Sequence, residues 1–115
     1  MKQEDYATHV RTFTDEMIAT TMAKNPDYSA GSDDAMNNYY EVGEAASIDP
    51  LKAWMVFMTK HWTAIKRYVR DGKVSSEPIH GRLIDLATYA MLGDALIKDL
   101  AAKKGESSDT DRTEK

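Results

Sequence analysis

Apolar residues recur along most of the chain at alternating steps of three and four, which is the spacing of one face of an α-helix. The longest unbroken series lies in the last third of the sequence and contains Ile79, Leu83, Leu86, Ala90, Gly93, Ile97 and Leu100. We expect this face to lie in the core. A second strip beside it contains Asp85, Tyr89, Leu92 and Leu96. A carboxylate at the edge of so wide an apolar sector requires a partner.

Turn formers and capping residues divide the rest of the chain into three further helices. Residues 25–32 collect Asn, Pro, Asp, Gly and Ser and predict a loop. Asp49 followed by Pro50 is a helix start, and Gly72 is a helix stop. The expected helices, with their caps, cover about residues 2–24, 32–47, 49–71 and 76–103.

The predicted fold class is all-α, a four-helix bundle-like domain, because no segment has the alternating pattern of a strand. Residues 1–103 form one domain, and residues 104–115, which are polar and lack periodicity, form a disordered tail. The last predicted helix is apolar nearly all round. A chain of 115 residues has no deep centre to bury such a helix, so we expect a homo-oligomer.

Composition narrows the classes of ligand and compartment. The net charge of −4 and the absence of a basic run argue against nucleic acid as the main ligand. The sequence has no cysteine, which excludes disulfides and thiolate metal sites. No apolar run approaches the ~20 residues of a membrane span, and the start does not read as a signal peptide. We therefore expect a cytoplasmic protein without a membrane partner.

Two groups of residues are candidates for chemistry. Glu41 and Glu44 lie one helical turn apart, and Asp85 on a different helix is able to face them, which suits a Mg²⁺ site. The competing interpretation of this acidic row is a solvated face, and the pair of glutamates is common by chance. His61 lies on the core stripe of its helix, where a histidine is more often a hydrogen-bonded core residue than a catalyst. Basic residues on neighbouring faces, Lys60, Lys66, Arg67 and Arg70, are able to neutralise carboxylates or phosphates, although scattered cations on a helix flank usually do neither.

Four segments carry a resemblance to a known family: KNPDYS, AMNNYYEVGEAASIDP, KHWTAIKRYVRDGKV and SEPIHGRLIDLATYAML. Together they resemble small phage proteins of the "nucleotide modification associated" type, which are in turn similar to the MazG-like and dUTPase-like all-α nucleoside triphosphate pyrophosphohydrolases. The resemblance spans about residues 24–96. Its specific part consists of Glu77, Ile79, Asp85, Leu86, Ala87 and Tyr89. It implies a helical, oligomeric protein that acts on or binds nucleotides in the cytoplasm of a phage-infected host cell.

The chain departs from the pyrophosphohydrolase pattern at one position. That pattern has ExxE on one helix and ExxD on a later one, and Glu41, Glu44 and Asp85 match three of its four acidic positions. The fourth position is Arg82 here. A cation at this point opposes Mg²⁺, but its guanidinium suits direct contact with a phosphate.

Three hypotheses follow. The first is a nucleotide-binding protein that sequesters a nucleotide-derived signal of host defence. Its candidate contacts are Tyr28 and Tyr89 or a Trp for base stacking, Lys60, His61, Arg67 and Arg82 for phosphate, and Asn38 and Glu41 for the base or ribose. The second is a Mg²⁺-dependent pyrophosphohydrolase with Glu41, Glu44 and Asp85 as metal ligands. The third is a helical bundle that binds protein or serves a structural role without catalysis.

Overall fold

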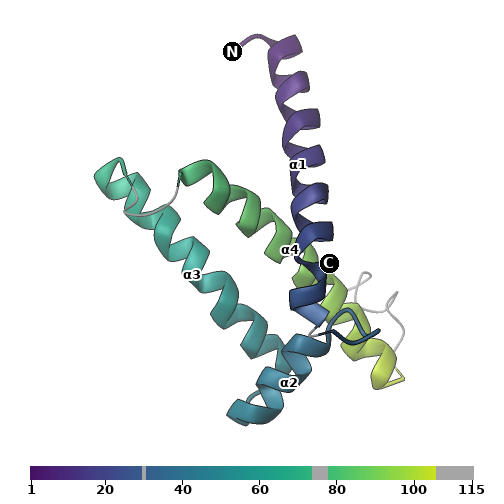
Figure 1. The fold of residues 1–115 in the computed structure, drawn as a ribbon. Helices are drawn as coiled ribbons and strands as arrows, with labels where there is room; N and C mark the ends of the chain where they lie inside the picture. Colours follow the sequence, from purple (N-terminus) through teal and green to yellow (C-terminus); the bar gives the residue numbers. More distant parts are fainter. Residues whose placement is uncertain (30, 74–77, 106–115) are drawn as a thin grey trace.

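A computed structural model of the chain describes residues 1–29, 31–73 and 78–105, and within them all regular structure is helical (Figure 1). The helices are α1 (Gln3–Ser29), α2 (Asn37–Ala46), α3 (Pro50–Asp71) and α4 (Ile79–Lys103). The predicted all-α class is confirmed. α3 and α4 run side by side in opposite directions, α1 packs on α4, and α2 packs on α3 and α1. No helix of the described residues has both the length and the apolar character needed to cross a bilayer.

α1 is longer than the sequence predicted. Residues 25–29, expected in a loop, form the end of the helix, with Pro26 inside it. A proline removes one backbone donor, a cost that a helix near its end tolerates. The helix stops where Gly31 adopts a left-handed φ of 76° and donates its N–H to the carbonyl of Pro26 at 3.2 Å. The loop prediction is therefore wrong for residues 25–29.

α2 starts later than predicted, at Asn37 and not after Ser32. The hydroxyl of Ser32 accepts a hydrogen bond from the N–H of Asp34 at 3.0 Å, and a carboxylate oxygen of Asp34 accepts one from the N–H of Met36 at 2.9 Å. These bonds close two turns before the helix and do not cap it. The predicted end near Ser47 is confirmed, since α2 ends at the residue before it.

Both predicted ends of α3 are confirmed. The Asp49 carboxylate accepts the N–H of Leu51 at 2.8 Å, and Pro50 is the first helical residue. Gly72, at a φ of 76°, donates its N–H to the carbonyl of Tyr68 at 2.7 Å. The expected caps of α4, Ser76 and Glu77, lie outside the described residues, as do residues 106–115 of the predicted tail.

The core lies where α2 meets the α3–α4 pair. Its buried apolar side chains are Met36, Tyr39, Leu92 and Leu96. Trp54 of α3 packs against them and donates its indole N–H to the carbonyl of Tyr89 at 2.7 Å. Gly93 has no side chain, which leaves room on α4 for the Trp54 ring. α3 and α4 are therefore joined both by packing and by a side-chain hydrogen bond to the backbone.

The two apolar strips of α4 differ from the prediction in which of them is buried. The narrower strip faces the core, where Leu92 and Leu96 are buried. Every second member of the longer series, Leu83, Ala90 and Ile97, is exposed. The expectation that the whole longer series lies in the core is therefore wrong within the described chain.

The apolar face of α1, which contains Tyr6, Val10, Phe13 and Met17 at helical spacing, is only partly covered. Figure 1 shows the first half of α1 extending beyond the rest of the molecule. Tyr6 and Val10 on that half are exposed. Farther along this face, the Phe13 ring meets the His80 ring of α4 edge-on, with 6.0 Å between the ring centroids.

Candidate functional site

Asp85 lies between three helices, and its side chain is 14% exposed. The ammonium of Lys24 on α1 donates a hydrogen bond to one carboxylate oxygen at 3.1 Å. His61 Nδ1 on α3 is 3.6 Å from the other oxygen. The prediction that this carboxylate requires a partner is confirmed, since Lys24 pairs with it from another helix. The carboxylate is placed by α4 but neutralised by α1, so it connects these two helices.

His61 is buried, and its ring lies between Asp85, Arg82 and Tyr89. Burial lowers the pKa of His61 below its usual range, the nearby Asp85 opposes that shift, and the positive charges of Arg82, Lys60 and Lys24 reinforce it. The neutral imidazole uses Nδ1 as the acceptor of the Arg82 guanidinium at 3.4 Å. At 3.6 Å the Asp85 oxygen is too far from Nδ1 for a hydrogen bond, which agrees with an unprotonated Nδ1. His61 is therefore a core residue that orients Arg82.

The lowered pKa of His61 predicts that the protein loses stability on acidification below about pH 6.5. In that window the unfolded chain binds a proton at His61 that the folded chain does not, so the free energy of unfolding falls as the pH falls. The slope from this one group is at most about 1.4 kcal/mol per pH unit. Urea unfolding of the wild type and of His61→Gln between pH 7.5 and 5 tests this. An equal slope in both proteins would contradict it.

A cavity of about 360 Å³ lies beside this cluster and is lined by three of the predicted phosphate contacts, Lys60 and Arg67 from α3 and Arg82 from α4. A second cavity of about 350 Å³ is lined by Thr63, Lys66, Arg67 and Arg70. The two share Thr63 and Arg67, and no described residue that lines either one is acidic. Arg70 is already engaged by the carboxylate of Asp71, with two contacts of 2.8 Å. The remaining cations, Lys60, Lys66, Arg67 and Arg82, line these two volumes.

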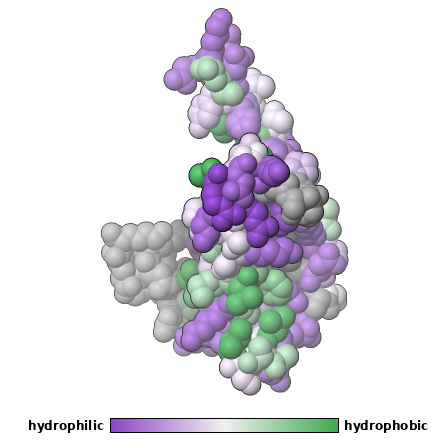
Figure 2. Space-filling view, turned by 90° about the vertical axis from the view of Figure 1, so that its left-hand side faces the viewer, coloured by the Kyte–Doolittle hydropathy of each residue, from purple (hydrophilic) through white to green (hydrophobic). Residues whose placement is uncertain are grey.

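Figure 2, which views the molecule from the left-hand side of Figure 1, shows hydrophilic residues gathered over the upper part of that face and hydrophobic residues over its lower part. The C-terminal half of α3, where the basic residues Lys60, Lys66, Arg67 and Arg70 occur, lies in the upper part in Figure 1. These four basic residues therefore follow one another closely along α3 in a protein whose net charge is −4.

One of the predicted base-stacking residues, Tyr89, is already in contact with another ring. Tyr89 packs on His61, with 5.1 Å between ring centroids and 33° between ring planes, so one of its faces is already covered. The side chain of Tyr28 lies outside the described part of the structure. Tyr89 is not among the described residues that line the basic cavities.

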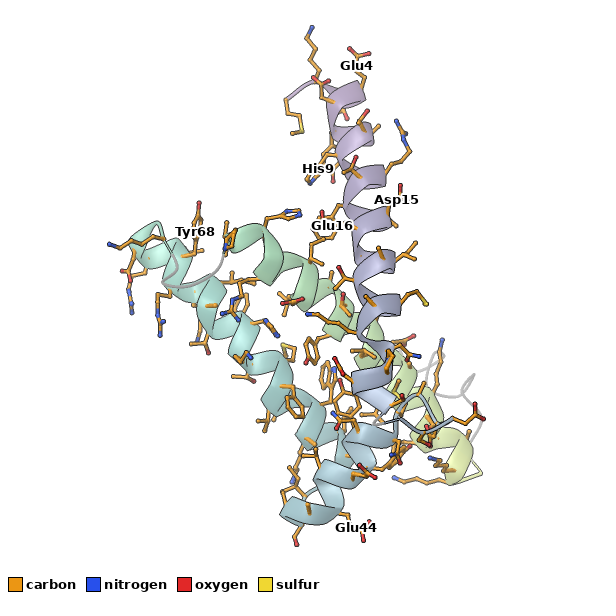
Figure 3. All side chains as sticks on the ribbon, in the orientation of Figure 1. Glu4, His9, Asp15, Glu16, Glu44 and Tyr68 are labelled. Atoms are coloured by element: carbon orange, nitrogen blue, oxygen red, sulfur yellow. The ribbon has the colours of Figure 1, made fainter. Side chains whose placement is uncertain are left out.

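The predicted residues of α2 lie apart from the basic cavities. Asn38 is half-buried, Glu41 and Glu44 are exposed, and none of them lines either cavity. Figure 3 shows Glu44 at the outer end of α2, directed away from the other helices. Asp85, by contrast, is enclosed between α1, α3 and α4.

This arrangement bears on the predicted magnesium site. Among the residues that the structure describes, no three His, Cys, Asp or Glu side chains are grouped so as to hold a metal ion. Glu41, Glu44 and Asp85 are therefore not assembled into a metal centre within this part of one chain. Magnesium binding stays a prediction.

The sequence did not identify Lys24 as a site residue. Its helix was expected to end at that position, whereas α1 continues to Ser29 and carries Lys24 onto α4. The only available signal was the need of Asp85 for a partner, which does not say from where the partner comes.

No protein-family model, curated protein or solved structure matches the chain.

Proposed function

We propose that this protein binds a nucleotide or nucleotide-derived molecule, with its phosphates in the cavity between Lys60, Arg67 and Arg82. The supporting observation is that two helices bring three cations to one cavity of about 360 Å³, which is within the usual range for small-molecule sites. Arg82 is oriented by His61, and the guanidinium of either arginine offers the planar fork that phosphate oxygens accept. The resemblance to phage nucleotide proteins points to the same class of ligand.

The positive charges that line this cavity favour the binding of an anion. Like charges that line one cavity repel one another, and a bound phosphate removes that repulsion. A ligand with two or three phosphates is long enough to extend from the first cavity towards the second, because the two share Thr63 and Arg67. Affinity should therefore rise with phosphate number and fall as salt is added.

Binding without turnover is the form of the proposal that fits these contacts. Cations that hold phosphate oxygens supply affinity, whereas hydrolysis also requires an activated water near the scissile bond. A protein that holds a nucleotide intact would sequester it, as proposed above for a nucleotide signal of host defence.

A thermal shift assay tests the proposal. The panel contains nucleoside mono-, di- and triphosphates, cyclic nucleotides and ADP-ribose derivatives, and the bound molecule is then recovered and identified by mass. A ligand present at about 100 times its Kd adds about 2.7 kcal/mol to stability, which raises the melting temperature clearly. We expect at least one member to shift the melt and to be recovered unchanged.

Matched variants show whether the shift comes from this cavity. Arg67→Gln and Lys60→Gln should each weaken binding about tenfold or more, because each removes a charged hydrogen-bond donor. Lys98→Gln makes the same change of charge on an α4 residue that lines neither basic cavity, and it should bind as the wild type does. If no compound shifts the melt, or if Lys98→Gln loses as much affinity as Lys60→Gln, the proposal is wrong.

A further inference from the structure

α3 and α4 each carry apolar residues in a seven-residue repeat, and about half of these residues are exposed. The exposed members, which we call the outer face, are Met55, Trp62, Val69, Leu83, Ala90 and Ile97. Within each helix they are spaced by seven residues, and they alternate with a more buried set of the same spacing. That inner set contains Leu51, Met58 and Ile65 on α3 and Ile79, Leu86 and Gly93 on α4. Together the two sets form the continuous stripe that faces the centre of a coiled-coil-like bundle, and here only one half of that stripe is covered.

The exposed residues of the two helices lie on the same side of the pair. Trp62 directly follows His61, which contacts α4 through the Tyr89 ring. Leu83 directly follows Arg82, whose guanidinium contacts His61 on α3. On each helix, moving one residue along the chain turns the side-chain direction by about 100° around the helix axis, in the same sense. For antiparallel neighbours, equal rotations away from the line of contact bring both side chains to the same side.

The other two helices do not cover this side. α1 contacts α4 through Asp85 and His80, and α2 approaches α3 through Phe57, none of which belongs to the outer face. The outer face is therefore left uncovered by α1 and α2 within the described residues.

We propose that the outer face is the interface of a homodimer, in which a second copy of the α3–α4 pair completes a four-helix bundle. A partner must present the same heptad spacing on two antiparallel helices, and a second copy does so by construction. α3 and α4 contain 22 and 25 residues, so the face is about 30 Å long and about 20 Å wide. That amounts to roughly 600 Å² per copy, near the ~800 Å² per partner of a stable interface.

Charges at the borders of the face favour one orientation. Lys52 and Asp94 are exposed at the edge of the face on α3 and α4. They lie at the same level along the pair, because Trp54 packs against Gly93. When α3 of one copy packs on α4 of the other, Lys52 of each copy lies beside Asp94 of its neighbour. The dimer then gains opposite charges along both edges.

Light scattering coupled to size exclusion tests the interface. We expect the wild type to elute as a dimer at high micromolar concentration and Leu83→Glu to elute as a monomer. Met91→Glu is the matched control, since Leu83 and Met91 both lie on α4 and are both 41% exposed, but only Leu83 belongs to the outer face. A wild type that is monomeric, or a Met91→Glu variant that dissociates equally, would overturn the inference.

Two further variants guard against a simple folding defect and test the orientation. Val69 is 79% exposed, so Val69→Glu should keep the helix content of the folded chain and still dissociate the dimer. Lys52→Glu should weaken the dimer, and adding Asp94→Lys should restore it. A failure of this rescue would contradict the α3-on-α4 orientation. The outer face shares no residue with the basic cavities, so this result and the nucleotide test are independent.

Discussion

Replacing Gly93 with alanine is expected to destabilise the protein by about 2 kcal/mol, although alanine is the better helix former. A Cβ atom at this position would lie 2.5 Å from Cζ2 and 2.7 Å from Cε2 of Trp54. The indole cannot move away without loss of its 2.7 Å hydrogen bond to the carbonyl of Tyr89, which is worth about 1 kcal/mol. Overpacking and the lost bond together outweigh the gain in helix propensity of about 0.5–1 kcal/mol.

The other internal glycine of the same helix provides the control. A Cβ atom at Gly81 would meet no atom within 4 Å, and Gly81 lies in the first turn of α4. Gly81→Ala should therefore stabilise the protein by about 0.5–1 kcal/mol. Urea denaturation of both variants measures the difference. A Gly93→Ala protein as stable as Gly81→Ala would mean that Trp54 does not pack against α4 as described.

The sequence predicted those parts of the fold that depend on neighbouring residues. The start of α3 at Asp49 and Pro50 and its end at Gly72 follow from local backbone chemistry, and both are confirmed. Gly93 appeared in the sequence only as a member of an apolar series. Its closeness to Trp54, which lies 39 positions earlier, depends on how α3 and α4 dock, and helical periodicity does not specify this.

The same distinction applies to the candidate site. The sequence placed Asp85 beside a buried surface and therefore predicted a partner for it. Lys24, however, comes from a helix that was predicted to end at that residue and in fact continues to Ser29. Lys60, Arg67 and Arg82 were proposed together with His61 as phosphate contacts, and all three line one cavity. Asn38 and Glu41 were proposed for the same ligand and lie apart from that cavity, because α2 packs near the opposite end of α3.

Replacing Asp85 with asparagine is expected to lower the free energy of unfolding by about 1–2 kcal/mol. The carboxylate is 14% exposed, and without its charge Lys24 and Arg82 repel each other across His61. The cost is smaller than for a fully buried pair, because Lys24 is 44% exposed and keeps contact with water. Asp15→Asn is the matched control, since Asp15 is an exposed carboxylate on α1 outside the proposed dimer interface. It should change stability by less than about 0.5 kcal/mol.

Acidification separates this effect from a general loss of packing. Asp85 is the group that raises the pKa of His61 against the effect of burial and of the neighbouring cations. Its removal should lower that pKa further, so the acid-induced loss of stability in Asp85→Asn extends to lower pH than in the wild type. An unchanged pH profile would show that the Asp85 charge does not act on His61.

The same substitution distinguishes binding from hydrolysis, because the two hypotheses predict opposite effects on the nucleotide. If cations alone hold the phosphates, removing a negative charge behind Arg82 strengthens binding, by on the order of 1 kcal/mol or roughly fivefold. If Asp85 is a ligand of Mg²⁺, Asp85→Asn weakens metal binding and abolishes Mg²⁺-dependent release of pyrophosphate, as does Glu41→Gln. Titration calorimetry with the nucleotide and a pyrophosphate assay on the same preparations measure both. Tighter binding without turnover supports sequestration, whereas loss of a wild-type hydrolytic activity would establish the metal enzyme in its place.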